Sequence, residues 1–260
     1  MTYIDQLKRA IQLNKTPKRI ISLVPSQTEL LVDLGLESSI VGVTKFCVHP
    51  KHLRMSKAVV GGTKQINIEK IKALRPDIIL CNKEENTKEI IESLEEIAPI
   101  HISDIYNLDD CFELINMYGE IFDIKRTTST LVANIQLERE AFQVTLQNTD
   151  KLKVAYFIWK KPWMIAASDN FIDAMITEAG FVNVFKDDKR YPEVDLSNPK
   201  LKEADLIFLS SEPFPFKEEH ILEFQKKFPK KTIKIVDGEL FSWYGSRVLK
   251  SYSYFKTFHN

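Results

Sequence analysis

Few residues of this sequence have the types and spacing that catalysis requires. Its five histidines include only two that are close together, His49 and His52, and HExxH, GxSxG and the glycine-rich phosphate loops are absent. Ser26 of "VPSQT" stands where a strand turns into a helix, but the glycines of a nucleophile elbow are missing. We therefore predict Ser26 or Thr28 as a helix N-cap, with backbone N–H groups that can also face a ligand. No catalytic centre is predicted.

The cysteines do not have the spacing of a metal site or of a disulfide framework. Cys47, Cys81 and Cys111 are odd in number, widely separated and without a CxxC pair. We predict that they are small, buried, apolar residues.

Aromatic and charged residues gather in segments that follow apolar runs typical of buried strands. "SSEPFPF" after "ADLIFL" is stiffened by two prolines and carries one carboxylate, which is unusual for a solubilising loop. All three tryptophans lie in such segments. Rings with a few charges suit a mostly apolar ligand with polar groups. The predicted ligand-binding residues of these segments are Ser26, Gln27, His49, Lys83, Glu84, Glu85, Trp159, Trp163, Glu212, Phe214, Phe216, Trp243, Tyr244 and Arg247.

Strands and helices alternate through the first half of the chain. Apolar runs at 19–24, 40–44, 77–81 and 99–103 predict strands, after a short one at 9–13, and helices are predicted at 26–35, 67–76, 87–98 and 108–122. Continuous apolar strands between helices indicate a parallel sheet covered on both faces. We expect Asn67 to cap its helix and Gly35 to end the first one.

Residues 125–150 contain no glycine, no proline and no strand signal. Their apolar residues Leu131, Val132, Ile135, Ala141, Phe142 and Leu146 fall largely on one helical face. This pattern predicts one long helix, which is either a lone surface helix or a rigid connection between two lobes.

The second half resumes the alternation and resembles the first. Strands are predicted at 154–159, 183–185, 205–210 and 232–237, and helices at 169–180, 217–229 and 246–258. We therefore predict an α/β protein of two Rossmann-like lobes with parallel sheets. The predicted domains are 1–124, the connecting helix 125–150, and 151–260. Because ligands bind at the carboxyl ends of parallel strands, both lobes are expected to contribute loops to one cleft.

Composition excludes several classes of function. Lysine plus arginine equals aspartate plus glutamate, and the resulting net charge of zero argues against general nucleic-acid binding. No apolar run reaches the length of about 20 residues that a membrane helix needs. The N-terminal residues lack the apolar core of a signal peptide. As given, the chain is expected to be soluble and either cytoplasmic or already trimmed.

At this point the sequence resembles a known family. "KRIISLVPSQTELLVDLGLESSIVGVT", "VGGTKQINIEKIKALRPDIIL", the long helix and a second lobe ending in a tryptophan-containing loop are similar to class III periplasmic binding proteins. These are the substrate-binding proteins of ABC importers for cobalamin, haem and ferric siderophores, and the cobalamin-binding branch is the most similar. The resemblance covers nearly the whole chain.

The resemblance implies two lobes joined by one rigid helix, with a metal-chelate ligand between them and no intrinsic cofactor. It implies a glutamate on each lobe that meets the transporter permease dimer. Glu69 matches in the first lobe, whereas Ser197 stands at the second position with Glu193 nearby. Ahead of the "NIE" helix this chain has Lys64, a further ligand-binding candidate, where relatives have an aromatic residue. His49 is a candidate axial ligand to the metal of the chelate.

Two interpretations remain open from the sequence. The first is a monomeric, non-catalytic binding protein of the periplasm or cell envelope that delivers its chelate to an importer. The alternative is a cytosolic tetrapyrrole carrier or chelatase-like enzyme on the same architecture. The absence of an export signal favours the second, and the aromatic segments without a catalytic triad favour the first.

Overall fold

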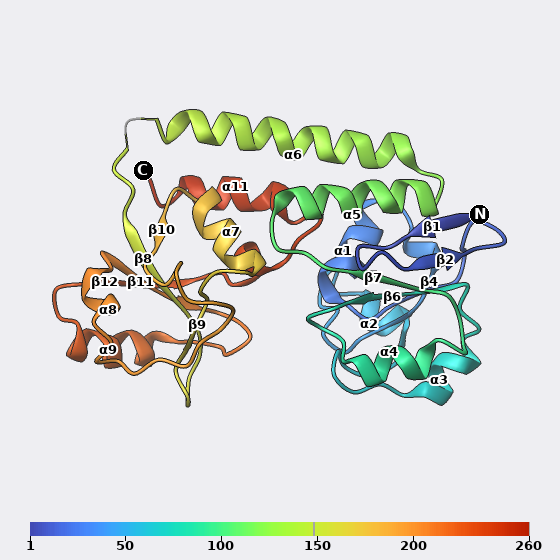
Figure 1. Ribbon diagram of the computed structural model, residues 1–260, viewed down its shortest axis with the longest axis horizontal. Coiled ribbons are helices and arrows are strands. Elements are labelled where there is room, and N and C mark those ends of the chain that lie inside the picture. Colours follow the sequence, from blue (N-terminus) through green and yellow to red (C-terminus); the bar gives the residue numbers. More distant parts are fainter. Residues whose placement is uncertain (148, 260) are drawn as a thin grey trace. The chain divides into compact units, whose positions relative to one another are not determined.

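The computed structural model describes residues 1–147 and 149–259, and the chain divides into two compact units (Figure 1). The first unit comprises Met1–Ile105, Asp109–Ile135 and Tyr244–Arg247, and the second comprises Tyr106–Leu108, Gln136–Trp243 and Val248–Asn260. Neither unit is continuous in sequence. A four-residue segment from the end of the chain thus belongs to the first unit, which the alternation of strands and helices does not predict.

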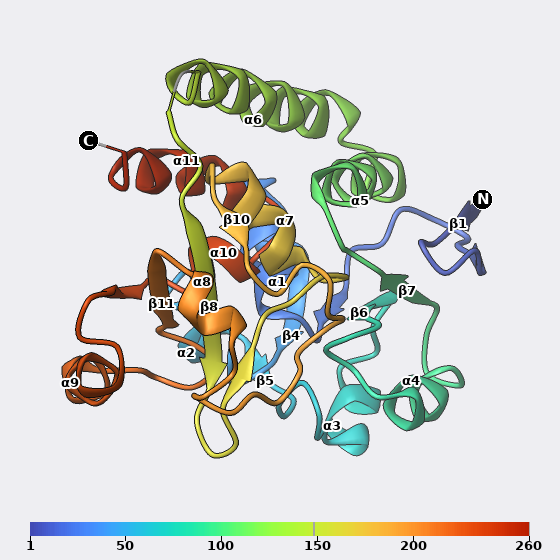
Figure 2. The same ribbon diagram turned by 60° about the vertical axis from the view of Figure 1, so that its left-hand side comes forward.

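The first unit is built on a parallel sheet of five strands in the order β5-β4-β3-β6-β7. The strands are β3 (Ile20–Ser22), β4 (Ile40–Val43), β5 (Ala58–Val59), β6 (Ile78–Asn82) and β7 (Ile100–Ser103). The helices are α1 (Pro25–Asp33), α2 (Leu53–Ser56), α3 (Ile68–Ala73), α4 (Lys88–Leu94) and α5 (Leu108–Ile121), with a short 3-10 helix at Glu37–Ser39. In both views α5 lies on one side of this sheet, and α3 and α4 lie on the other (Figures 1 and 2).

Local signals account for most of these helix ends. The side chain of Asn67 accepts a hydrogen bond from the backbone N–H of Lys70 at 2.9 Å and caps α3, as predicted. Gly35 follows α1 with a φ of +80°, a conformation that glycine adopts at little cost. The prediction of Ser26 or Thr28 as the cap of α1 is wrong. The helix begins one residue earlier at Pro25, its N-cap is Val24, and no side chain caps it.

The two faces of the first sheet differ in chemistry. The face toward α3 and α4 buries an apolar cluster that includes Ile21, Ile79 and Ile100. The residues that alternate with these point to the other face, because successive strand side chains point to opposite sides. There, polar groups such as Ser22, His101 and Ser103 are buried beside α1 and α5.

An antiparallel hairpin precedes this sheet and was only partly predicted. β1 (Thr2–Ile4) pairs with β2 (Ala10–Gln12), whereas the sequence indicated only the second strand. Side chains of the hairpin turn reach the open edge of β7. The backbone N–H of Ile102 donates to Asp5 at 3.3 Å, and that of Asp104 donates to Gln6 at 3.1 Å. The turn therefore protects an edge strand that would otherwise expose backbone donors.

One unbroken helix, α6 (Lys125–Thr145), connects the halves of the chain. It ends five residues before the predicted limit of 150, and at about 1.5 Å per residue its 21 residues span roughly 31 Å. Its buried or half-buried stripe includes Leu131, Ile135 and Phe142, but Ala141 is exposed, and the half-buried Leu146 follows directly after the helix. The residues up to Ile135 belong to the first unit and those from Gln136 to the second.

The second unit has a sheet in the order β10-β8-β11-β12, with β9 paired to β8. The strands are β8 (Lys153–Trp159), β9 (Met164–Ile165), β10 (Val182–Asn183), β11 (Leu206–Ser210) and β12 (Thr232–Val236). The helices are α7 (Phe171–Glu178), α8 (Lys200–Glu203), α9 (Glu218–Lys227), α10 (Glu239–Ser242) and α11 (Val248–Lys256). All pairs are parallel except β8 with β9, whose hairpin is not predicted by the sequence.

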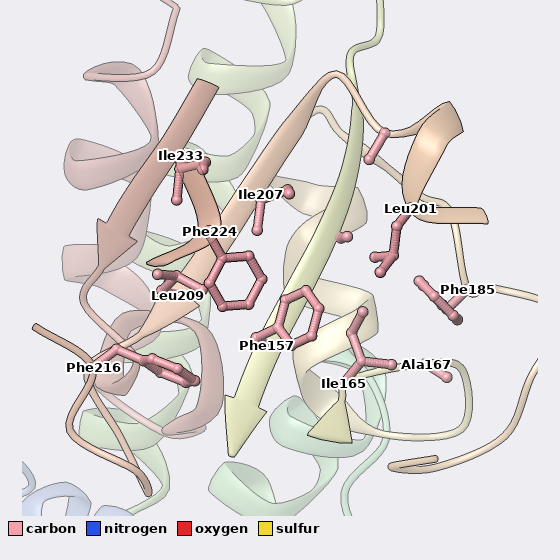
Figure 3. Close-up of a cluster of buried hydrophobic side chains, with 12 residues drawn as sticks. Phe157, Ile165, Ala167, Phe185, Leu201, Ile207, Leu209, Phe216, Phe224 and Ile233 are labelled. Carbon is pink, nitrogen blue, oxygen red and sulfur yellow. The ribbon is translucent and has the colours of Figure 1, made fainter. Parts of the chain in front are cut away.

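Aromatic residues fill both faces of this second sheet. On one face, Phe157 of β8 meets Phe224 of α9 with ring centroids 4.9 Å apart, within the cluster drawn in Figure 3. On the other, Phe208 of β11 packs against Phe241 of α10 and Phe258. The prediction of an α/β fold with two parallel sheets and one long helix is confirmed. Within the described residues, no helix combines the length and the apolar character needed to cross a membrane.

Candidate functional site

In the first unit, the segments that follow β3, β4 and β6 lie at one edge of the sheet, because parallel strands end at the same side. These segments contain Ser26, Gln27, His49 and the stretch 83–85, all of them predicted ligand-binding residues. This carboxyl edge is where open α/β sheets bind ligands. Sequence-predicted residues are thus brought together within the first unit.

Gln27 is the centre of a buried polar network and has no exposed surface. Its side-chain amide donates to the hydroxyls of Ser103 at 2.6 Å and Tyr244 at 3.0 Å, and its carbonyl oxygen accepts from Tyr118 at 2.6 Å. Ser26, the residue before Gln27, is also buried. Buried amides need such partners, since an unpaired one costs about 1–3 kcal/mol. Gln27 therefore supports the site from within and holds Tyr244.

A loop after β6 presents charged side chains. The side chain of Asn82 accepts hydrogen bonds from the backbone N–H groups of Glu84 at 2.9 Å and Glu85 at 3.1 Å, which fixes the turn. Lys64 donates to the carbonyl of Glu84, and Lys83 pairs with Asp104 at 2.6 Å.

Glu85 is half-buried in this loop. Its pKa is raised above the usual range by burial, although the ammonium of Lys64 opposes the shift. A carboxyl group in this setting can accept from, or when protonated donate to, an amide of a ligand.

His49 is half-buried in the segment after β4. Among the described residues, no group of three or more histidine, cysteine, aspartate or glutamate side chains is arranged to hold a bare metal ion. A metal that arrives inside a chelate needs only one protein ligand at an axial position. The role of His49 therefore stays a prediction.

The Tyr244–Arg247 segment packs into the first unit by three kinds of contact. Besides the Tyr244 hydroxyl, the backbone N–H of Gly245 donates to Sγ of Cys111 at 3.1 Å. Gly245 has a φ of +95°, and a Cβ atom there would lie 3.2 Å from Leu30, so a larger residue would be strained.

The guanidinium of Arg247 donates to both carboxylate oxygens of Glu29, at 2.7 and 2.9 Å. Only 8% and 5% of the two side chains are exposed. The sequence predicted Arg247 as a ligand-binding residue, but the structure gives its guanidinium an internal partner. This bidentate geometry is the strongest arrangement available to arginine.

In the second unit, two loops form an aromatic wall at the ends of β8 and β11. The rings of Trp159 and Phe214 lie 5.7 Å apart in an edge-to-face arrangement, and the backbone N–H of Phe214 donates to the carbonyl of Ile158 at 3.3 Å. Trp159 is 38% exposed, and Phe214 is half-buried between the exposed residues Pro213 and Pro215. This wall offers ring faces and stiff backbone to an apolar ligand.

Glu212 connects this wall to Trp243. One carboxylate oxygen of Glu212 accepts from the indole N–H of Trp243 at 2.9 Å and from the hydroxyl of Ser242 at 2.7 Å. Trp243 is mostly buried, with 8% exposed. The acidic residue in "SSEPFPF" therefore holds a tryptophan that follows 31 residues later.

Two further predicted ligand-binding aromatics pack against the core of the second unit. The ring of Trp163 stacks on that of Phe216 with an interplanar angle of 8°, and it also contacts Phe224. Phe216 belongs to the buried cluster of Figure 3 and is 4% exposed. Both rings therefore contribute to the hydrophobic core of the second unit.

The predicted docking residues are on the surface. Glu69 has 83% of its side chain exposed in the first turn of α3 and pairs with Lys72 at 3.1 Å. Glu193 is exposed in the second unit, beside the half-buried Val194, and Ser197 is exposed as well.

Sequence reasoning missed the residues that support the site, namely Glu29, Asn82, Asn86, Ser103 and Tyr118. A charged residue on the apolar face of α1 was the available signal for Glu29, because buried charges require partners. The others show no sequence pattern that distinguishes them from ordinary polar residues.

Comparison with known proteins agrees with this architecture. The family model described as periplasmic binding protein matches residues 20–234. An uncharacterized ABC transporter substrate-binding lipoprotein of Bacillus subtilis is 27% identical over 155 residues, which cover 58% of this chain and 49% of that protein. The chain thus matches about half the length of that relative.

A vitamin B12-binding protein of Vibrio vulnificus is 27% identical over 204 residues, which cover 77% of this chain and 74% of that protein. The structure of a periplasmic heme-binding protein from Roseiflexus superposes with a TM-score of 0.80 at 17% identity, covering 93% of this chain and 98% of the other. Similarity at that identity establishes a shared fold. Since the family model spans most of the sequence, this chain belongs to the periplasmic binding protein family.

Proposed function

We propose that this protein is the substrate-binding component of an ABC importer and that it binds a metal chelate without chemically changing it. The observation that carries the proposal is the position of its aromatic and charged residues. Within each unit they lie at the carboxyl ends of parallel strands, in a chain that belongs to the periplasmic binding protein family.

The two groups of residues have complementary chemistry. The wall of the second unit supplies the rings of Trp159 and Phe214, and the first unit supplies Lys64, Glu85 and the imidazole of His49. A corrinoid, a haem or a ferric siderophore combines a large, partly apolar body with a few polar substituents, and this set suits such a ligand. Relatives named for vitamin B12 and heme support the ligand class.

Ligand contact is assigned to exposed or half-buried groups, except for Trp163, whose ring stacks on Phe216. We retain His49, Lys64, Lys83, Glu84, Glu85, Trp159, Glu212 and Phe214 as ligand-binding candidates, with Ser26, Gln27, Trp243 and Tyr244 behind them. Two lobes with ligand between them, the boundaries at 124 and 150, and a monomeric state belong to the same proposal. Glu69 and Glu193 are proposed to meet the permease, in an extracytoplasmic setting.

A titration followed by tryptophan fluorescence tests this function. Cobinamide, cobalamin, haemin and ferric siderophores are added separately to the protein. Additions of buffer without chelate serve as the blank. Quenching by at least one of them with a micromolar or tighter dissociation constant is expected. If none of these chelates changes the fluorescence of the folded protein, and none gives a heat of binding in calorimetric titration, the proposal is wrong. Conversion of a bound chelate, detected by mass spectrometry, would instead favour the chelatase-like alternative.

A further inference from the structure

Lys64 and Glu85 come from two separate loops at the carboxyl edge of the sheet in the first unit. Lys64 lies in a tight turn after β5, where the backbone N–H of Gly62 donates to the carbonyl of Gln65 at 2.6 Å. Glu85 lies in the turn after β6 that the side chain of Asn82 fixes. The ammonium of Lys64 lowers the pKa of Glu85 against the effect of burial, so the two charged groups interact across the loops.

The side chain of Asn86 joins these two loops. Its amide nitrogen donates to the carbonyl of Thr63 at 3.0 Å and to that of Leu23 at 3.5 Å. Its carbonyl oxygen accepts from the backbone N–H of Asn82 at 2.9 Å. Thr63 is the residue before Lys64 in the chain, and Asn86 is only 2% exposed. One buried amide thus connects the ends of β3 and β6 with the turn after β5.

Two further contacts link the same loops, but they end on charged side chains. The ammonium of Lys64 donates to the carbonyl of Glu84, and the hydroxyl of Thr63 donates to the carboxyl of Glu85. An exposed lysine loses rotamer freedom when it is held in one place, which offsets much of what such a contact contributes. All three partners of Asn86 are backbone groups, so its bonds fix the loops themselves.

We propose that Asn86 is a positioning residue that sets the separation between the ammonium of Lys64 and the carboxyl group of Glu85. Asn86 does not have to touch ligand in this role. It presents a hydrogen-bond donor and an acceptor at a fixed spacing, which matches polar substituents of one size. The inference deepens the proposed function and rests on it only for the contact of this pair with ligand.

A double-mutant cycle without ligand tests the positioning. The pKa of Glu85 is followed by the NMR signal of its carboxyl carbon during acid titration of the native chain, Lys64→Met, Asn86→Ala and the double variant. In the native background Lys64→Met should raise the pKa of Glu85, because the opposing charge is removed. In the Asn86→Ala background the same change should have about half the effect or less. Equal effects in both backgrounds would overturn the inference.

The matched control is Asn170 of the second unit, which is also 2% exposed. Its amide nitrogen donates to the carbonyls of Ala167 at 2.8 Å and Ser168 at 3.0 Å. Asn170→Ala therefore removes a comparable buried amide and should leave the effect of Lys64→Met on Glu85 unchanged. An equal weakening in this control would show that general loss of stability, and not the bridge, is responsible, and would also overturn the inference.

Other features of the cycle keep the result decisive. Glu84 and Tyr244, the other titratable groups that interact with the Glu85 carboxyl, are present in all four proteins, so their contributions cancel. If Asn86→Ala does not fold, Asn86→Ser replaces it, because the shorter side chain keeps an acceptor but loses the amide donor, and the same weakening is required. A chain that binds no chelate would end the proposed function and leave this positioning standing.

Discussion

Arg247 and Glu29 are 218 residues apart in the chain, yet their side chains form a bidentate ion pair that is almost completely buried. The pair joins the segment before the last helix to the first helix after β3. Desolvating two charges is costly, and only good geometry with both partners present offsets that cost. Loss of one partner is therefore more damaging than loss of both.

We accordingly predict that Arg247→Met and Glu29→Met each lower the free energy of unfolding by about 3–5 kcal/mol. The double variant should be more stable than either single one, because no buried charge is left unpaired. Urea unfolding followed by circular dichroism measures all three. Glu69→Met, which breaks an exposed pair with Lys72, serves as a control and should change stability by less than about 1 kcal/mol. Additive losses in the double variant would contradict the prediction.

The three cysteines are predicted to be unreactive in the folded protein. Burial raises the pKa of Cys81 and of Cys111 to about 12 and also raises that of Cys47, so the nucleophilic thiolate is scarce. An aromatic disulfide reagent at mildly alkaline pH should detect almost no thiol in native protein and all three after denaturation. A rapidly reacting thiol in the native protein would show that its surroundings open.

His101 is predicted to weaken the fold in acid. Its ring is fully buried against Tyr118 with centroids 5.4 Å apart, and burial lowers its pKa from 6.5 to about 4. The unfolded chain therefore binds a proton more readily than the folded one. Above about pH 6.5 both states are neutral and nothing is lost, and between 6.5 and 4 stability falls by up to about 3 kcal/mol.

The measurement is urea unfolding across that pH range for the native chain and for His101→Phe. The aromatic replacement fills the site without titrating, so its stability should fall less steeply between pH 6.5 and 4. Parallel pH profiles for the native chain and His101→Phe would show that His101 does not cause the loss of stability in acid.

Trp159→Ala should weaken chelate binding by about 1–3 kcal/mol, because an exposed ring at the wall loses its contact with ligand. Stability should change little, since Trp159 is among the exposed large apolar residues. Leu222→Ala, which removes an exposed apolar side chain from α9, is the matched control and should leave affinity unchanged. Calorimetric titration with the chelate that quenches fluorescence provides the readout, and equal affinity in all three proteins would exclude the wall as a binding surface.

Glu69→Arg should preserve ligand affinity and abolish uptake, because the charge that would face the permease is reversed on an exposed position. Transport of the bound chelate into vesicles that contain the cognate importer measures this. Glu92→Arg reverses another exposed glutamate, on α4, and should transport normally. Glu193→Arg tests the second proposed docking position in the same assay. Normal uptake with both Glu69→Arg and Glu193→Arg would remove the docking proposal.

Sequence patterns predicted the elements better than the contacts between them. Continuous apolar strands, the cap at Asn67 and the glycine after α1 each act locally, so their signals are visible in a short window. The Arg247–Glu29 pair depends on how distant segments meet, which no short window contains.

The same limit explains why the sequence did not distinguish the aromatic residues at the wall from those in the core. Trp159 ends β8 and Trp163 follows four residues later, so the two look similar in sequence. The β8–β9 hairpin separates them, leaving Trp159 at the wall while Trp163 stacks on Phe216. The register of an unpredicted antiparallel pair thus decides which ring is available to a ligand.

Because Tyr244–Arg247 completes the first unit, a nascent chain lacks part of that unit until translation is nearly finished. The bidentate pair of Glu29 with Arg247 and the bond from Gln27 to the Tyr244 hydroxyl need residues synthesised more than 200 positions later, whereas Gln27 can bond Ser103 earlier. The first unit can therefore complete its internal contacts only when the last part of the chain has been synthesised.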